Sequence, residues 1–435
     1  MIERLGWHSL NTSFQCPCGV THNLPIEVCH VGVDAAERMA EFARERCGHT
    51  CLVLADQNTR QAAGDAPLSA LSAAGKHVTE HVFPGAPFEA TEALAKQVAE
   101  WGASADFFVA IGTGTLCDLA KYAGDKHHRP VLSYATAASM NGYTSAIVAL
   151  KVRGLKRTLP CAPVIGAFAN PEVVATAPQR MTAAGVGDFL SKTSSSADWR
   201  ASNILRDCYY CPRPREFSEE IQGRIIDAAP RVGKGDPEAI GLVLEGLLLT
   251  GLGMVVAGSS APASGGEHLL SHYLDMKHAL YDTPSDLHGT QVGVGTVYAL
   301  SLWEQVLAQD PDALDLDALV ARHPTEETIR DWIEDDWGPV APEVLAQWLE
   351  KSLSPQGLRA ELERIKTQLW QLRALLAEDL LPAATVAQAI EQAGGPVQPE
   401  GLEAPIEEYR NAQRRARFLR NRFTVLDLAA ELGVA

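Results

Sequence analysis

The first part of the chain alternates short runs of β-branched and aliphatic residues with longer stretches whose apolar residues recur at helical spacing. Short runs of this kind, bounded by turn-forming residues, predict strands. They lie at residues 27–31, 50–55, 77–83, 107–111 and 131–134, with helical stretches at 35–46 and 90–101. Because strands that alternate with helices are typical of a parallel sheet with crossover helices, we expect a Rossmann-like α/β domain that binds a nucleotide.

The pattern changes to almost continuous helix in the second part of the chain. Between residues 145 and 169, β-branched runs separated by Gly154 and Pro160 predict a hairpin that closes the first domain. Beyond it, the clearest helices are predicted at 238–256, 288–306, 356–377 and 406–419. We therefore expect an α/β domain at 1–172 and an all-α domain at 173–435, with the active site in the interdomain cleft.

One apolar stretch, at residues 239–258, approaches the length and hydrophobicity of a membrane span. It contains Glu245 and several glycines, and polar residues follow it directly. We therefore expect a helix buried in the protein core, and no membrane span.

Composition and charge narrow the class of protein. With 435 residues, of which 46% are hydrophobic and 21% charged, the chain has the size of two globular domains. A formal net charge of −17 opposes binding to nucleic acid, although a local pocket or a helix N-terminus still suits an anionic substrate. The N-terminal residues lack the basic and apolar regions of a secretory signal, so we expect a cytoplasmic protein.

The nine cysteines are an odd count in a chain without a signal peptide, which favours free thiols over a disulfide framework. The pairs Cys16/Cys18 and Cys208/Cys211 together offer four thiolates for zinc. One residue separates the first pair, where zinc sites usually have two or more. The favoured interpretation is therefore a turn around Pro17, with two unrelated thiols elsewhere.

A glycine-rich loop follows the predicted strand at 107–111. In Gly112-Thr113-Gly114-Thr115, glycines let a diphosphate approach the backbone where a new helix begins. The third glycine of the dinucleotide fingerprint is absent, so a plain strand-to-helix turn is an equal alternative.

Two other predicted strands also end in polar residues. Asp56, after the strand at 50–55, suits ribose hydroxyls or a helix N-cap. Thr136 and Ser139, after the strand at 131–134, suit a cofactor bed or a turn.

Asp188, His268 and His288 form a candidate metal site. Asp188 lies in Gly-Val-Gly-Asp, where we expect a helix to start, and each histidine lies beside glycine or an acidic residue. One carboxylate and two imidazoles leave a coordination position open for a carbonyl or alkoxide. His272, one helical turn after His268, gives an alternative histidine pair, and thirteen histidines make chance pairings common.

The order of these motifs resembles a known family. IGTGTLCDLAK, TAASMNGYTS, GVGDFLSK, ASGGEHLLSH and HGTQVGVGT follow one another as in sn-glycerol-1-phosphate dehydrogenases, within the superfamily of iron-type alcohol dehydrogenases and dehydroquinate synthases. ADQNT, DWRAS and RNRFTVLDLA extend the resemblance along almost the whole chain. It implies that Asp188, His268 and His288 bind the metal and that His272 contacts substrate. The residues that would bind the dinucleotide are Asp56, Gly112, Thr113, Gly114, Thr115, Leu116, Thr136, Ser139 and Ser145.

Asn141 departs from the family pattern. The family usually has aspartate after TAAS-Met, at a position that faces the substrate, and this chain has Met140-Asn141-Gly142-Tyr143. A neutral amide either weakens substrate binding and changes its specificity, or is a tolerated isostere that still accepts hydrogen bonds.

The resemblance implies a metal-dependent oxidoreductase that interconverts dihydroxyacetone phosphate and sn-glycerol 1-phosphate, and a homodimer. The cofactor would be NAD or NADP, with one divalent zinc, nickel or iron ion. Asp56 beside the ribose would favour NAD, because a carboxylate repels a 2′-phosphate. Lys192, four residues after Asp188, is a candidate phosphate partner or a solvent-facing lysine.

Three alternatives stay open. They are a dehydrogenase of unphosphorylated polyols such as glycerol, a dehydroquinate-synthase-like lyase, and a cofactor-binding scaffold without catalysis. The lyase would need several basic phosphate-binding residues that are not evident here, and intact Asp188, His268 and His288 argue against the scaffold.

Overall fold

The computed structural model describes residues 4–85, 88–152 and 155–434. The chain forms two compact units, each assembled from several segments. The first contains residues 1–189, 212–260 and 392–395, and the second contains residues 190–211, 261–391 and 396–435. These units are defined by compactness, whereas the boundary near residue 172 was predicted from the change in secondary structure. That boundary therefore stays a prediction.

The first unit is built on a six-stranded sheet in which every neighbouring pair is parallel. In sheet order the strands are β3 (Val28–Val31), β10 (Gly166–Ala169), β7 (Val131–Ala135), β6 (Phe107–Gly112), β4 (Thr50–Asp56) and β5 (His77–Phe83). The parallel sheet confirms the predicted fold class. The carboxyl ends of β4, β6 and β7 carry the candidate cofactor residues.

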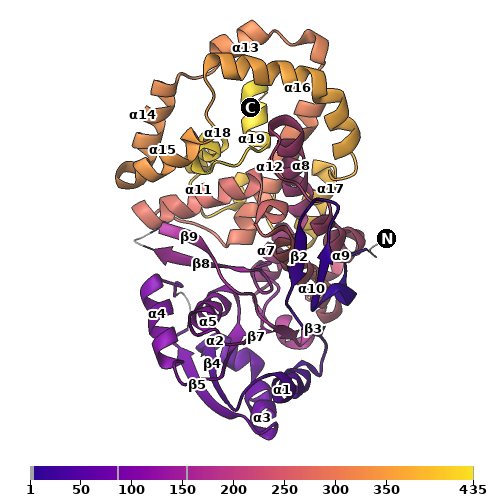
Figure 1. Cartoon of the computed structure of the whole chain (residues 1–435), viewed down its shortest axis with the longest axis vertical. Helices are drawn as coiled ribbons and strands as arrows, with labels where there is room; N and C mark the ends of the chain where they lie inside the picture. The colour runs from indigo at the N-terminus through magenta and orange to yellow at the C-terminus, as the bar shows by residue number, and fades with distance from the viewer. Residues whose placement is uncertain (1–3, 86–87, 153–154, 435) are drawn as a thin grey trace. The chain divides into compact units, whose positions relative to one another are not determined.

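Helices cover both faces of the sheet (Figure 1), so alternate residues of the strands pack against different helices. Val53, Val109 and Leu132 belong to a core with residues of α1 (Ala35–Arg46) and α3 (Ala66–Ala73). Side chains of the other parity, such as Phe108, contact α4 (Glu92–Trp101) and α5 (Gly114–His127), because they point to the opposite face of the sheet.

Two small hairpins complete the strands. β8 (Ile147–Val152) pairs antiparallel with β9 (Leu155–Pro160), which confirms a hairpin there, while its Gly154 lies outside the described residues. Residues 166–169, predicted as part of that hairpin, instead form β10 inside the main sheet, so that prediction was wrong. β1 (Thr12–Gln15) and β2 (Thr21–Leu24) form an antiparallel hairpin that the hydrophobic pattern did not predict.

Further helices pack within the first unit. They are η1 (Trp7–Ser9), α2 (Gln57–Ala63), α6 (Pro171–Val174), α7 (Gln179–Leu190), η2 (Arg213–Arg215), α9 (Glu216–Val232) and α10 (Pro237–Ala257). α10 is the one helix, among the described residues, long and apolar enough to cross a membrane, and 83% of its most apolar window is buried inside the protein. This confirms the prediction of a buried core helix.

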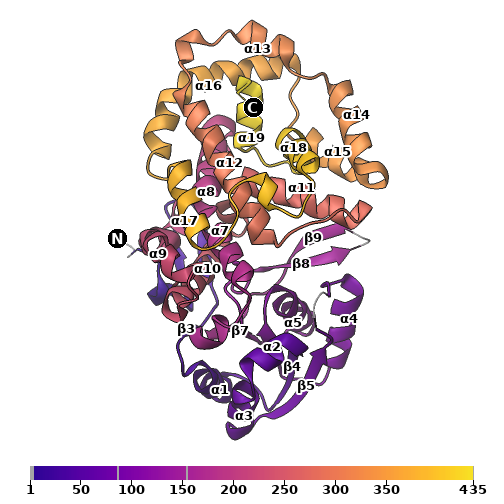
Figure 2. The ribbon, with the colours of Figure 1, turned by 180° about the vertical axis from the view of Figure 1, so that it is seen from behind.

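All regular secondary structure in the described residues of the second unit is helical. Its longer helices are α8 (Lys192–Arg206), α11 (Gly266–Tyr281), α12 (His288–Ala308), α14 (Glu326–Trp337), α16 (Pro355–Leu376), α17 (Ala383–Gln392) and α18 (Ile406–Arg415). The shorter ones are η3 (Ala261–Ala263), η4 (Pro311–Ala313), α13 (Leu316–Arg322), η5 (Gly338–Val340), α15 (Ala341–Leu349), η6 (Pro399–Gly401), η7 (Ala416–Leu419) and α19 (Val425–Leu432). α11 and α12 pack side by side and carry the candidate histidines (Figure 2).

Candidate active site

The glycine-rich loop joins β6 directly to α5. A Cβ atom on Gly112 would lie 2.2 Å from Cδ1 of Leu116, so a larger residue there would have to displace the Leu116 side chain. The side chain of Thr113, the N-cap residue, makes no capping bond to α5 within the described part of the chain. The first N–H groups of this 14-residue helix are therefore suited to an anionic group such as a diphosphate.

Asp56 caps the N-terminus of α2, which follows β4 at the same edge of the sheet. Its Oδ1 accepts hydrogen bonds from the backbone N–H groups of Asn58, at 2.8 Å, and Thr59, at 2.9 Å. The N-cap interpretation of Asp56 is therefore confirmed. Both bonds use one carboxylate oxygen, and a role of the other toward a ribose stays a proposal.

The segment after β7 forms a loop whose backbone carbonyls accept hydrogen bonds from buried side chains. Thr136 is buried and Ser139 is half-buried. The hydroxyl of Tyr143 donates to the carbonyl of Ala137 at 2.7 Å, and the buried ammonium of Lys121 donates to the carbonyl of Gly142 at 2.8 Å. These bonds fix the loop that would form the cofactor bed.

Ser145 is enclosed by the same loop. Its side chain is fully buried, and its hydroxyl donates to the carbonyl of Gly142 at 3.0 Å. The structure therefore places Ser145 where it braces the loop, while direct contact with a cofactor remains a prediction.

Asp188 lies near the end of α7, so the prediction that it starts a helix was wrong. The glycines before it lie inside the helix, where Gly185 allows close packing. A Cβ atom on Gly185 would come within 1.9 Å of the carbonyl oxygen of Ala138, so α7 approaches the cofactor loop only with glycine at this position. Asp188 is fully buried, and its Oδ2 accepts the backbone N–H of Asn141 at 2.9 Å.

The side chain of Asn141 is half-buried, and its Nδ2 has no hydrogen-bond partner among the described residues. Buried amide donors are nearly always satisfied in folded proteins, so this orphaned donor is available to a ligand or a water molecule. This fits the predicted position of Asn141 facing a substrate.

Three imidazoles cluster in the second unit. His268 and His272 lie in α11, and His288 is the first residue of α12. The ring centroids of His268 and His288 are 5.1 Å apart, and His272 lies 6.1 Å from the first and 5.9 Å from the second. The packing of α11 against α12 thus brings His268 and His288 close together, although they are twenty residues apart in the sequence.

Hydrogen bonds orient two of these rings. Nδ1 of His268 pairs with Oε1 of the buried Glu267 at 2.9 Å, and Nδ1 of His288 pairs with the hydroxyl of Ser271 at 3.0 Å. Such partners fix the ring and leave Nε2 for a metal ion. Sequence reasoning missed Glu267 and Ser271, although their proximity to the histidines in GGEHLLSH was a possible signal.

His272 has a different environment. Burial, the charge of Arg420 and the neighbouring imidazoles hold the pKa of His272 well below its usual range. Its Nδ1 is buried with no hydrogen-bond partner in the described residues. His272 is therefore neutral near physiological pH, with a nitrogen atom left for a ligand or water.

Asp198, from the motif DWRAS, supports the histidine helix. Its Oδ2 accepts the backbone N–H of Gly266 at 2.7 Å, and its Oδ1 accepts that of Val425 at 2.9 Å. Burial, with the neighbouring Glu267 carboxyl, raises the pKa of Asp198 well above its usual range. A Cβ atom on Gly265 would lie 2.4 Å from the same carboxylate, which explains the glycine at this position.

Lys192 is not solvent-facing, so that alternative was wrong. Its side chain is buried, and its ammonium donates to the carbonyl of Ala263 at 3.1 Å and to the hydroxyl of Ser191 at 3.0 Å. α7 ends at Leu190 and α8 begins at Lys192, so Lys192 does not continue the helix of Asp188 as predicted.

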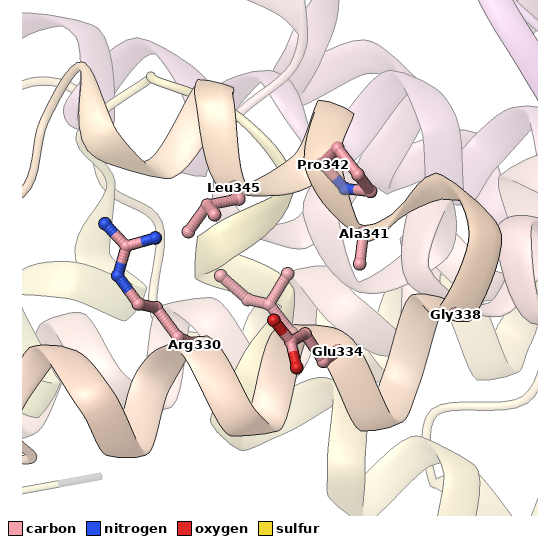
Figure 3. A pocket seen from close by; sticks show the side chains of 7 residues that line it. Arg330, Glu334, Gly338, Ala341, Pro342 and Leu345 are labelled. Atoms are coloured by element: carbon pink, nitrogen blue, oxygen red, sulfur yellow. The ribbon is translucent and has the colours of Figure 1, made fainter.

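A surface pocket of about 350 Å³ lies elsewhere, between α14 and α15 (Figure 3). Its lining residues are Arg330, Ile333, Glu334, Gly338, Ala341, Pro342 and Leu345. None of the predicted site residues lines it. Arg330 is also engaged by Glu326, so we assign this pocket no chemistry.

Comparison with known proteins gives consistent relatives. The family described as "Iron-containing alcohol dehydrogenase" matches residues 30–178. A glycerol-1-phosphate dehydrogenase, NAD(P)+, of Geobacillus stearothermophilus is 30% identical over 392 residues, which cover 83% of this chain and 96% of the relative. An enzyme of the same name from Thermococcus kodakarensis is 34% identical over 289 residues, covering 65% of this chain and 80% of the relative.

Solved structures share the fold. Glycerol dehydrogenase from Schizosaccharomyces pombe covers 81% of this chain and 92% of its own, with a TM-score of 0.56 and 18% identity. Alcohol dehydrogenase from Oenococcus oeni covers 92% of this chain and 94% of its own, with a TM-score of 0.57 and 16% identity.

Proposed function

The chain belongs to the glycerol-1-phosphate dehydrogenase family, within the iron-containing alcohol dehydrogenases, and on that premise we propose that it interconverts dihydroxyacetone phosphate and sn-glycerol 1-phosphate. The resemblance predicted from the motifs is confirmed by these relatives. The protein is an NAD(P)-dependent, metal-dependent oxidoreductase. In such enzymes the nicotinamide carries the hydride, and the protein supplies binding and orientation.

We propose that Asp188, His268 and His288 hold one divalent metal ion. The observation that carries this proposal is the pair of imidazoles whose Nδ1 atoms are already held by Glu267 and Ser271. One carboxylate and two such imidazoles suit zinc, nickel or iron. A bound ion of this kind supplies the Lewis acidity that polarises a carbonyl for hydride attack.

Asn141 and His272 are the proposed substrate contacts. The orphaned Nδ2 of Asn141 would donate a hydrogen bond to a substrate oxygen. The aspartate common in the family could not donate this bond, because an ionised carboxylate only accepts hydrogen bonds. His272, neutral because of its lowered pKa, would exchange the proton of the substrate hydroxyl, directly or through water.

Arg420 is a better candidate than Lys192 for the substrate phosphate. It lies close enough to His272 for its charge to lower the pKa of that imidazole. A guanidinium also binds phosphate through two parallel hydrogen bonds. The ammonium of Lys192 already donates to two protein oxygens, which leaves it less available.

The dinucleotide is proposed to bind at the carboxyl ends of β4, β6 and β7. The diphosphate would lie against the N-terminus of α5, with the loop from Thr136 to Ser139 beneath the nicotinamide half. Asp56 would approach the adenosine ribose and favour NAD over NADP. The interdomain location of the site, a homodimer and a cytoplasmic location are further parts of this proposal.

The test compares two substrates under matched conditions. Metal-reconstituted protein is mixed with NADH and either dihydroxyacetone phosphate or dihydroxyacetone, with and without chelator, while reduced nicotinamide is followed by absorbance. Chelator-sensitive oxidation that needs the phosphate supports the proposal. Turnover of the unphosphorylated ketone alone would identify a polyol dehydrogenase, the alternative that Asn141 keeps open.

Arg420→Gln separates the phosphate role from the chemistry. We expect this variant to raise KM for dihydroxyacetone phosphate about 10- to 100-fold, since a charged hydrogen bond contributes about 1.5–3 kcal/mol. Activity toward an unphosphorylated ketone should stay near its wild-type level. Equal losses with both substrates would remove Arg420 from the phosphate site.

A further inference from the structure

The N-terminal hairpin brings metal-ligating side chains together. Beyond β1, the backbone N–H of Cys16 donates to the carbonyl of Val20 at 3.1 Å, which extends the ladder by one pair. The N–H of Gly19 donates to the carbonyl of Cys16 at 3.0 Å, and Gly19 has φ of +89°, a backbone conformation that favours glycine. This turn confirms the one predicted around Pro17.

Strand alternation then places the side chains on one buried face. His22 lies opposite Phe14 in the ladder, and their ring centroids are 5.3 Å apart. Cys16, two residues beyond Phe14, points to the same face. His22 is 3% exposed and Cys16 is 8% exposed, while Nε2 of His22 lies 3.2 Å from Sγ of Cys18 in the turn.

A fourth ligand comes from a distant segment. Cys211, 1% exposed, directly precedes Pro212, which leads into η2. The ligand atoms of Cys16, Cys18, His22 and Cys211 all lie within 4.8 Å of one another. Ligand atoms bound to one tetrahedral zinc ion are about 3.8 Å apart, given Zn–S bonds of about 2.3 Å. The four atoms are therefore already close to the geometry of one ion.

We propose that Cys16, Cys18, His22 and Cys211 form a closed structural zinc site. It shares no residue with the proposed catalytic ligands, and its three thiolates and one imidazole leave no open coordination position. The site would fasten the short β1–β2 hairpin to the chain at Cys211, since a two-stranded hairpin alone is marginally stable. Three thiolates around Zn²⁺ would give the site one net negative charge. The positive guanidinium of Arg213 lies 5.7 Å from the ring of Phe14, which shares the face of the hairpin with Cys16 and His22, so it would favour that charge.

This assignment corrects the thiol pairing considered from the sequence. Cys208 is exposed and does not join the cluster, and His22 takes the fourth position instead. The single residue between Cys16 and Cys18 does not prevent chelation, because the turn at Gly19 brings both toward His22.

Cobalt substitution tests the site without relying on catalysis. Full-length protein loaded with Co²⁺ should show a thiolate-to-cobalt charge-transfer band, to which Asp188, His268 and His288 would contribute nothing because they contain no sulfur. We expect the full band in wild type and in Cys208→Ser, the matched control, and a weaker band or none in Cys211→Ser, which keeps only two of the three thiolates. Absence of the band in the wild type, or a band of undiminished intensity in Cys211→Ser, would overturn the proposal.

Zinc content gives a second readout that does not depend on one variant. Cys16→Ser should lose its zinc to a competing chelator at a lower chelator concentration than wild type. His22→Cys, which exchanges one zinc ligand for another, should hold zinc more tightly than His22→Ala, which keeps only three ligands. If Cys16→Ser unfolds, the His22 pair still decides the matter. Equal zinc affinity in His22→Ala and His22→Cys would contradict the site, whatever the outcome of the dehydrogenase assay.

Discussion

Replacing Gly185 by alanine tests the packing that positions Asp188. The added Cβ would lie 1.9 Å from the carbonyl oxygen of Ala138 and 2.7 Å from its carbonyl carbon, whereas carbon atoms in contact lie about 3.5 Å or more apart. Backbone atoms block the methyl group, so α7 and the loop after β7 must separate. Overpacking of this kind destabilises proteins by about 1–3 kcal/mol.

Gly223 provides the matched control. It lies inside α9, and none of the described residues has a heavy atom within 4 Å of a Cβ built there. Gly223→Ala should therefore stabilise the protein by about 0.5–1 kcal/mol through helix propensity. At about 2–4 °C of melting temperature for each kcal/mol, the Gly185 variant should melt at least a few degrees below this control.

The assay is differential scanning calorimetry of both variants, with dehydrogenase kinetics on the folded proteins. Because the carboxylate of Asp188 accepts the N–H of Asn141, displacement of the loop should also lower kcat/KM in Gly185→Ala and leave Gly223→Ala unchanged. Equal melting temperatures for the two variants, with equal activity, would refute the close packing of α7 against the loop.

Three further predictions concern the site itself. Glu267→Ala should weaken metal binding about 10- to 100-fold, measured by competition with a chromogenic chelator, because His268 loses its orienting partner; unchanged affinity would count against that role. Asn141→Ala should raise KM for dihydroxyacetone phosphate about 3- to 10-fold if its Nδ2 donates to the substrate, and an unaltered KM would show that it does not. The folded pKa of His272 is lowered, so the unfolded chain binds a proton first, and metal-free protein should lose stability as pH falls through about 6.5. Melting temperatures measured above and below this pH should differ less in His272→Gln than in the wild type. The same pH dependence in the variant and the wild type would contradict a lowered pKa of His272.

Much of the sheet could be predicted because its inner strands β4, β6 and β7 are almost fully buried apolar runs that end at turn-forming residues. The run at 77–83 gave β5 with its observed bounds, and Asp56 was correctly offered as an N-cap. β10 was missed because residues 166–169 are four small or aromatic residues whose pairing with β3 and β7 depends on tertiary structure.

The sequence likewise predicted part of the candidate site and missed the features that depend on packing. The sequence suggested Asp188, His268 and His288, but the segment from Gly185 to Asp188 was interpreted as a helix start. It lies inside α7, where Gly185 allows close contact with Ala138. The support of His268 by Glu267 depends on side-chain direction, which spacing alone does not reveal. The thiol cluster required the fold, because Cys211 is remote in sequence from the hairpin.

The central claim is hydride transfer to C2 of dihydroxyacetone phosphate with formation of sn-glycerol 1-phosphate. The most direct measurement incubates metal-loaded protein with dihydroxyacetone phosphate and NADH deuterated at C4, then determines the position of deuterium and the configuration of the product. The account predicts deuterium at C2 of sn-glycerol 1-phosphate when the transferred face of the nicotinamide is labelled. Formation of the opposite enantiomer, or no reduced product with label on either face, would contradict it.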